Sequence, residues 1–257
     1  MSGSVNIGCS GYSYAHWRGN FYPPGLPDRE FLEFYSSRFS CVELNITFYQ
    51  TPPENFFRSW AARTPDHFGF TLKGSRYITH VRHLNVSTEL DYFFRRARLL
   101  GSKLRAVLWQ LPPVMAPDLP RLQRFLEQLK TYRDIPQFFE FRHPGWLDIP
   151  TLQLLLDYEV GICGSDWPEA SCPELWCGRA VYFRRHGPAA YSGSYDSLAL
   201  LRDAELLRTH AAFGRETFLF FNNDLGGMAP ANAAETQRLV ARSAEVSQRV
   251  SGEKPVA

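Results

Sequence analysis

The sequence predicts an α/β fold in which eight parallel strands form a single (β/α)8 TIM-like barrel. Three features of the sequence lead to this prediction. Short apolar runs alternate with longer stretches of helical periodicity along nearly the whole chain, a pattern that favours parallel strands joined by helices. Eight such runs in 257 residues match the size of one barrel domain. No glycine-rich phosphate loop follows the first run, which disfavours an open doubly wound sheet.

The expected strands are the apolar runs, taken in chain order. They cover Val5–Cys9, Cys41–Asn45, Phe68–Lys73, Leu104–Gln110, Gln137–Arg142, Val160–Asp166, Ala180–His186 and Thr217–Asn223. The expected helices cover Asp28–Phe39, Pro53–Ala62, Ser87–Leu100, Asp118–Thr131, Ile149–Tyr158, Asp196–Ala212 and Ala229–Val250.

Local signals mark several helix starts. Asp28 and Asp118 are suitable capping residues, and Ser87 precedes Glu89 and an apolar stripe. Residues Pro168 to Gly178 contain no convincing helical pattern. No linker divides the chain, so residues 1–250 are expected to form one domain, with a flexible tail at residues 251–257.

Composition narrows the classes of protein. The 28 Lys and Arg residues and the 26 Asp and Glu residues leave a formal net charge of +2, which does not demand nucleic acid as a partner. No stretch approaches the ~18 apolar residues that a spanning helix needs, and no signal peptide is evident. Five scattered cysteines are typical of reduced thiols. We therefore expect a cytoplasmic protein that contacts no membrane.

Polar and apolar side chains alternate on four of the expected strands. The polar sets are Glu43 and Asn45, Thr71 and Lys73, Glu140 and Arg142, and Tyr182, Arg184 and His186. The apolar sets fit the helix-facing side of each strand, so the polar sets are expected to point into the barrel. Because active sites of this fold lie at the carboxyl ends of the strands, the pattern predicts a site there.

Two interpretations of these inward charges stay open. In the first, Glu43 and Glu140 neutralise Lys73, Arg142 and Arg184 in a structural ion-pair network. In the second, the charges perform chemistry on a ligand. The two are compatible, because a network of this kind can hold a site in shape.

The loops after the strands add aromatic and polar candidates. Tyrosine, tryptophan and arginine side chains at one mouth suit a ligand with flat or sugar-like faces and negative charge. Phosphosugars, nucleotides and single-stranded nucleic acid fit this description. The candidate ligand-binding residues are Asn45, Lys73, Arg142, Arg184, Trp17, Tyr49, Trp146, Tyr191 and Asn223.

The candidate catalytic residues are two carboxylates and two histidines. Glu43 or Glu140 is expected to act as a base, and His80 or His186 as a proton donor. For Glu140, a salt bridge with Arg142 remains the alternative. Lys73 is expected to act as a point charge toward an anion, with an imine to a carbonyl substrate as its alternative.

No cofactor is expected with certainty, and a divalent metal remains an alternative. Glu43, Glu140, Asp166 and His186 have suitable ligand types, although no His-Glu-x-x-His motif is present. The pair Cys172 and Cys177 lacks the second pair of a zinc site.

Several ordered motifs resemble those of the DUF72 family, also called YecE-like. They are Gly8-Cys-Ser-Gly-Tyr-Ser-Tyr, Trp17-Arg-Gly, Phe21-Tyr-Pro-Pro-Gly-Leu, Val42-Glu-Leu-Asn-Ile-Thr-Phe-Tyr, Phe70-Thr-Leu-Lys-Gly, Ile78-Thr-His, Gln110-Leu-Pro-Pro, Glu140-Phe-Arg-His-Pro-Gly-Trp, Asp166, Arg184-Arg-His-Gly, Tyr191-Ser-Gly-x-Tyr and Phe221-Asn-Asn-Asp. The resemblance spans about Ile7 to Arg242. It implies a TIM-like barrel and no established activity. Arg185 departs from the family pattern, which is usually apolar there, and is expected on the helix-facing side.

The sequence thus predicts an enzyme that acts on an anionic, phosphate-bearing substrate at the mouth of the barrel. One alternative is a protein that binds nucleic acid or a nucleotide. Another is a metal-dependent hydrolase or isomerase. The oligomeric state is left open.

Overall fold

A computed structural model describes residues 3–167 and 180–252 of the chain. Its strands are β1 (Val5–Cys9), β2 (Cys41–Leu44), β3 (Gly69–Lys73), β4 (Leu104–Gln110), β5 (Gln137–Glu140), β6 (Gly161–Ser165), β7 (Ala180–Arg185) and β8 (Glu216–Phe221). Each strand begins within one residue of its expected start, and five of the eight end one or two residues earlier than expected.

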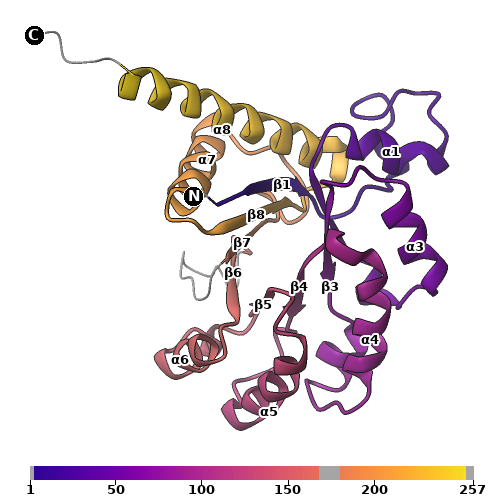
Figure 1. Cartoon of the computed structure of the whole chain (residues 1–257), viewed down its shortest axis with the longest axis vertical. Coiled ribbons are helices and arrows are strands. Elements are labelled where there is room, and N and C mark those ends of the chain that lie inside the picture. The colour runs from indigo at the N-terminus through magenta and orange to yellow at the C-terminus, as the bar shows by residue number, and fades with distance from the viewer. Residues whose placement is uncertain (1–2, 168–179, 253–257) are drawn as a thin grey trace, which may run out of the picture.

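All eight strands run parallel in one sheet of order β1-β8-β7-β6-β5-β4-β3-β2. The two outer members, β1 and β2, meet through an isolated parallel bridge between Ser10 and Glu43. The sheet therefore curls into a nearly closed ring (Figure 1), which confirms the predicted (β/α)8 TIM-like barrel.

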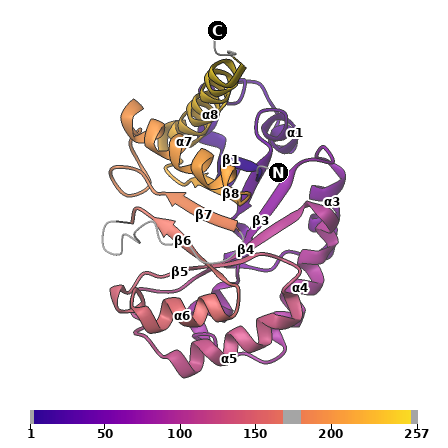
Figure 2. The same cartoon turned by 60° about the vertical axis from the view of Figure 1, so that its left-hand side comes forward.

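Helices surround this ring. The α-helices are α1 (Phe31–Ser36), α2 (Ile46–Tyr49), α3 (Glu54–Ala62), α4 (Glu89–Ala97), α5 (Leu119–Leu129), α6 (Ile149–Asp157), α7 (Ser197–Ala212) and α8 (Met228–Gly252). In Figure 2, helices α3 to α6 form an arc around one side of the strands, and α7 and α8 cover the other.

Helix starts agree with the sequence only in part. Asp118 caps α5 by accepting a hydrogen bond from the Arg121 backbone N–H at 3.0 Å. Asp28 does not act as a cap, because it opens a short 3₁₀ turn that precedes α1. Ser87 does not cap either; its backbone N–H donates instead to the Glu89 carboxylate at 2.8 Å. Helix α8 continues to Gly252, and the segment 168–178 and the last five residues lie outside the described residues.

Two apolar layers hold the barrel. A large cluster fills the space between sheet and helices, with Trp109 and Phe125 packed edge to face. A second, smaller cluster fills the lumen and includes Leu108, Phe138 and Phe218. On β2 and β5, the lumen residues Cys41 and Phe138 each lie two residues before the inward Glu43 and Glu140. The lumen is therefore apolar toward the amino ends of the strands and charged toward their carboxyl ends, so the charged side chains lie together at one mouth of the barrel.

Candidate functional site at the barrel mouth

Arg184 on β7 is the centre of the charged layer. Its guanidinium donates from Nη2 to Oε1 of Glu43 at 2.9 Å and from Nη1 to Oε2 of Glu140 at 2.7 Å. Arg184 is 1% exposed, and both glutamates are fully buried. The inward orientation predicted for these three residues is confirmed. One guanidinium links the two carboxylates, so they do not face each other as a pair that shares a proton.

Glu43 is held by a second donor. The Tyr182 hydroxyl donates to Oε2 of Glu43 at 2.6 Å and lies 3.0 Å from the Thr71 hydroxyl. Burial, with the Glu43 charge beside it, raises the pKa of Tyr182 well above its ordinary value. Tyr182 therefore stays protonated and keeps donating to Glu43.

Glu140 is shared between two arginines. Besides Arg184, Arg142 forms a buried ion pair with its carboxylate. Burial alone would raise the pKa of Glu140, but Arg184 and Arg142 hold it well below its ordinary range. A carboxylate with so low a pKa is a weak base at neutral pH. The geometry therefore favours the ion-pair role of Glu140 over the general-base role.

His186 connects the arginines to the rim of the mouth. Its Nε2 lies 3.0 Å from Arg142 Nη2 and 3.2 Å from Arg184 Nη1, and its Nδ1 lies 3.1 Å from Asp166 Oδ1. These partners assign a neutral ring that donates from Nδ1 and accepts at Nε2. Burial lowers the pKa of His186, in keeping with the neutral form.

Asp166 is fixed by two further donors. The backbone N–H of His186 donates to Oδ1 at 2.8 Å, and the Tyr195 hydroxyl donates to Oδ2. Burial alone would raise the pKa of Asp166, but the bonds from His186 and Tyr195 lower it. Asp166 therefore stays ionised and orients His186.

Lys73 differs from the two arginines. Its Nζ lies 4.1 Å from the centre of the Phe48 ring, and no carboxylate of the described residues lies within ion-pair distance of it. Withdrawal of the ammonium group from water, with Arg184 nearby, lowers the pKa of Lys73 to about 7. Its side chain remains partly exposed, whereas those of Arg142 and Arg184 are buried.

His80 stands beside Lys73. It lies on a π-helical turn, Tyr77–Val81, and its ring meets Phe48 edge to face at 4.9 Å. Its Nδ1 lies 2.8 Å from the Thr79 hydroxyl. Burial, followed by the charges of Lys73 and Arg76, lowers the pKa of His80 to about 4.

The predicted aromatic residues divide into two groups. Tyr49 is 76% exposed and Tyr191 40% exposed. Tyr191 packs against Trp167, whose ring lies 4.1 Å from the Arg142 guanidinium carbon. Trp17 and Trp146, in contrast, are fully buried and pack the loops below the rim. Their indole N–H groups donate to the backbone carbonyls of Asp224 and Met115 at 2.9 and 2.8 Å.

The two predicted asparagines also differ. Asn223 supports the loop after β7, because its Nδ2 donates to the Gly193 carbonyl at 2.7 Å and to Asn232 at 2.9 Å. Asn45 follows β2, and its buried Oδ1 has no hydrogen-bond partner within the described chain. The Asn45 carbonyl thus lacks a partner among the described residues, whereas the amide nitrogen of Asn223 is already used.

Arg185 lies outside the barrel lumen, as its position in the strand predicts. Its Nε donates to both oxygens of Asp203 on α7 at 3.0 Å. Asp203 thus provides a counterion for Arg185, the residue that departs from the family pattern. Arg184 and His186 keep their inward orientation.

The structure does not assemble the proposed metal ligands into a metal site. Across residues 3–167 and 180–252, no group of three or more His, Cys, Asp or Glu side chains is arranged to hold a metal ion. The Arg184 guanidinium lies between Glu43 and Glu140, and Asp166 and His186 contact each other instead. Cys172 and Cys177 lie outside the described residues. Cys9, Cys41 and Cys163 are buried and form no disulfide.

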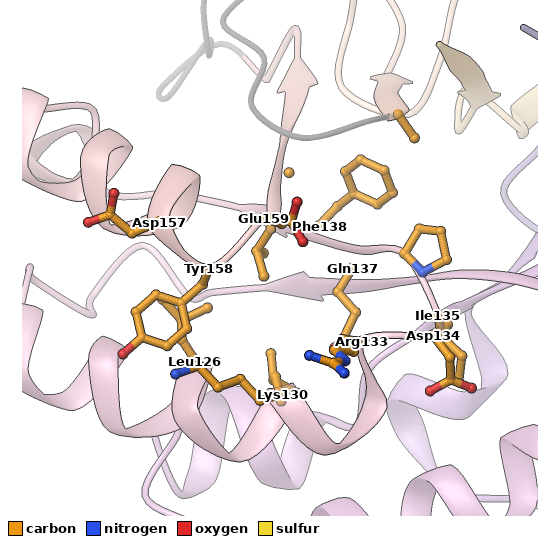
Figure 3. A pocket seen from close by; sticks show the side chains of 15 residues that line it. Leu126, Lys130, Arg133, Asp134, Ile135, Gln137, Phe138, Asp157, Tyr158 and Glu159 are labelled. Atoms are coloured by element: carbon orange, nitrogen blue, oxygen red, sulfur yellow. The ribbon is translucent and has the colours of Figure 1, made fainter. Parts of the chain in front are cut away.

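A cavity of about 390 Å³ lies elsewhere, between α5 and α6 (Figure 3). It borders Gln137, Gly161 and Ala180, which begin β5, β6 and β7. The amide of Gln137 is already occupied by Trp109 Nε1 at 2.9 Å and the Tyr132 carbonyl at 3.3 Å. This cavity is therefore at the amino end of the barrel, away from the charged layer.

Sequence reasoning did not identify several members of the site. Strand alternation placed Tyr182 and Thr71 inside the barrel but gave no partner for them. Two contacts could not be predicted from the sequence, because they depend on the conformation of loops. They are the contact of Trp167 with Arg142 and the contact of Tyr195 with Asp166.

Fold and site together define the class of the protein, a (β/α)8 barrel with an ion-pair network at the carboxyl ends of its strands. The model of the family described as "Protein of unknown function DUF72" matches residues 6–255. The chain therefore belongs to the DUF72 family, and the predicted resemblance is confirmed. Within the described residues, no helix has the length and apolar character needed to cross a membrane.

Relatives support this membership. The chain is 27% identical over 181 residues to the UPF0759 protein YunF of Bacillus subtilis, covering 68% of this chain and 62% of YunF. It is 33% identical over 115 residues to the UPF0759 protein YecE of Escherichia coli K12, covering 44% of this chain and 42% of YecE. The matches thus span less than two thirds of either relative.

A solved DUF72 family protein from Thermotoga maritima has the same architecture. It superposes with a TM-score of 0.80 at 27% identity and covers 92% of this chain and 99% of its own.

Proposed function

We propose that the mouth of the barrel binds a small, phosphate-bearing substrate and that the protein is an enzyme acting on it. The observation that carries this proposal is that Lys73 has no carboxylate partner among the described residues. Arg142 and Arg184 are both paired with carboxylates, whereas no described carboxylate pairs with Lys73. A partly exposed cation without a counterion, beside buried ion pairs, is an attractive contact for an anion.

Orphaned polar atoms support a ligand that also carries hydroxyl groups. Ser10 Oγ, Asn45 Oδ1 and Asn223 Oδ1 are buried and have no hydrogen-bond partner within the described chain. These residues follow β1, β2 and β8, which are neighbours in the ring. Leaving buried polar atoms unpaired costs about 1–3 kcal/mol each, so a hydroxylated ligand would gain by binding them. A phosphosugar combines both chemistries.

The buried ion-pair network would then keep the binding residues in position and would not itself react with the substrate. Glu43, Glu140 and Arg184 are almost completely buried and offer a substrate little surface, and Glu140 is a weak base. His80 is partly exposed and shares the Phe48 ring with Lys73. Among the four predicted catalytic residues, His80, a neutral imidazole near pH 7 because its pKa is lowered to about 4, is therefore our candidate for a hydrogen bond to the substrate, and Glu43, Glu140 and His186 position the cations.

Calorimetric titration with inorganic phosphate tests the proposal. We expect the wild-type protein to bind phosphate and Lys73→Met to lose at least tenfold in affinity. Lys130→Met is the matched control, because Lys130 is exposed and already paired with Glu127 at 2.8 Å. Equal affinity in the wild-type and Lys73→Met proteins would remove the basis for the proposal.

A further inference from the structure

The amino group of Lys73 has surroundings suited to a nucleophile. Its backbone carbonyl accepts a hydrogen bond from the Thr47 hydroxyl at 2.7 Å, which fixes the end of β3 against α2. The ring centre of Phe48, on the same short helix, lies 4.1 Å from Nζ. The side chain thus leaves a rigid strand end and is braced by an aromatic ring at the mouth.

The charges that face Lys73 come from three strands, β2, β5 and β7, and from the residues just after β5. They are Arg184, Glu140, Glu43 and Arg142, and His80 faces it from the π-helical turn. Burial lowers the pKa of Lys73 most, Arg184 and Arg142 lower it further, and Glu140 and Glu43, each bound to an arginine, oppose this shift. This environment gives Lys73 its pKa of about 7.

Near neutral pH, about half of such side chains carry a free electron pair on nitrogen. An ordinary lysine, with a pKa of ~10.4, is neutral in only about one molecule in 2,500 at pH 7. Desolvation beside other cations is the known route by which lysine becomes a nucleophile toward carbonyl groups.

We propose that Lys73 forms an imine with an aldehyde or ketone group of the phosphate-bearing substrate; this inference rests on the proposed function and names its substrate class. The neutral Nζ attacks the carbonyl carbon, and the π electrons move to oxygen. Proton transfer from nitrogen to oxygen gives a carbinolamine. The C–O bond then breaks, water leaves, and a protonated imine remains, with no oxidant or reductant consumed.

The product of this step keeps the charge that anion binding requires. A protonated imine carries one positive charge at the former Nζ, so the phosphate group of the same substrate retains its counterion. The iminium also withdraws electrons from the adjacent carbon, which favours loss of a proton there. Enolising or carbon–carbon bond-breaking reactions of phosphorylated carbonyl compounds are the reaction class that this chemistry serves.

Reductive trapping tests the inference. The full-length protein would be mixed at pH 7 with glycolaldehyde phosphate, reduced with sodium borohydride, and digested for peptide mass spectrometry. We expect Lys73 to be labelled at least tenfold faster than Lys130, whose pKa is raised by Glu127. Glycolaldehyde without phosphate should label Lys73 more slowly. Labelling of Lys73 and Lys130 at equal rates would overturn the inference.

The variant Lys73→Arg separates this inference from the proposed function. Arginine keeps the positive charge but forms no imine under these conditions, so phosphate binding should persist within about threefold while the label at position 73 disappears. If the wild-type protein binds phosphate but Lys73 is not labelled, the imine is excluded and anion binding stands. If the wild-type protein binds no phosphate, both proposals fail.

Discussion

Lys73 and Arg184 carry the same charge in contrasting surroundings, although both point to the mouth of one barrel. Arg184 is buried between two carboxylates, and Glu43 and Glu140 raise its pKa well above the ordinary value despite the opposing effect of burial. Lys73 is paired with no described carboxylate, and its pKa falls to about 7. At the scale of single residues, the ion pairs thus decide which cation is structural and which is available.

Removing Arg184 should strongly destabilise the fold. Arg184→Met leaves Glu43 and Glu140 buried without their shared counterion, and losing one partner of a buried pair costs about 3–5 kcal/mol. Urea unfolding would measure the loss. Arg98→Ala is the control, since its ion pair with Asp134 is exposed and should cost less than about 1 kcal/mol. A loss below 1 kcal/mol for Arg184→Met would contradict the buried network.

Anion affinity should depend on the protonation of Lys73. Sulfate does not titrate near neutral pH, so any pH dependence belongs to the protein. Because the pKa of Lys73 is about 7, the protonated fraction falls as pH rises, and affinity should weaken by about tenfold per pH unit above 7. Calorimetry with Lys73→Arg should show a flat profile. The same slope in that variant would assign the titration to another group.

At the scale of elements, strand alternation carried most of the predictive information. A strand presents alternate residues to opposite faces, so Glu43, Glu140 and Arg184 could be placed inside the barrel from the sequence. The sequence does not tell which of these residues form ion pairs with one another, because β2, β5 and β7 are brought together only by closure of the sheet. The same limitation explains why Trp17 and Trp146 looked like rim residues, although loop packing buries them.

The junction of β7 and α7 offers a separate test of alternation. Arg185 is the helix-facing neighbour of Arg184 and pairs with Asp203 at 3.0 Å. Asp203→Ala should cost about 2 kcal/mol, between the values for exposed and buried pairs. The double variant Arg185→Leu with Asp203→Leu should recover part of that loss. Thermal unfolding would reveal the difference; a double variant less stable than Asp203→Ala would refute the interpretation.

At the scale of the whole molecule, one seam of the barrel is weaker than the rest. Seven neighbouring pairs of strands form ladders, whereas β1 and β2 meet at the isolated bridge between Ser10 and Glu43. The backbones approach closely there, and a Cβ added at Gly8 would lie 2.3 Å from the Cys41 carbonyl oxygen. The sequence predicted the number of strands but not this uneven closure, in which the Tyr35 hydroxyl links the two strands by accepting from the Cys9 N–H at 2.8 Å and donating to the Cys41 carbonyl at 3.0 Å.

Gly8→Ala should therefore open the seam. Overpacking of this kind costs about 1–3 kcal/mol, and amide hydrogen exchange should accelerate in β1 and β2 before the other strands. Gly25→Ala is the matched control, because nothing lies within 4 Å of a Cβ at Gly25. Unchanged exchange in β1 and β2 would show that the seam tolerates the added methyl group.

The central claim is that the barrel mouth holds an anion at Lys73, and a crystal structure grown with phosphate tests it most directly. We predict a phosphate within hydrogen-bond distance of Lys73 Nζ, with Arg184 still bound to Glu43 and Glu140. An empty mouth at saturating phosphate, or phosphate bound only at surface arginines away from Lys73, would contradict the account.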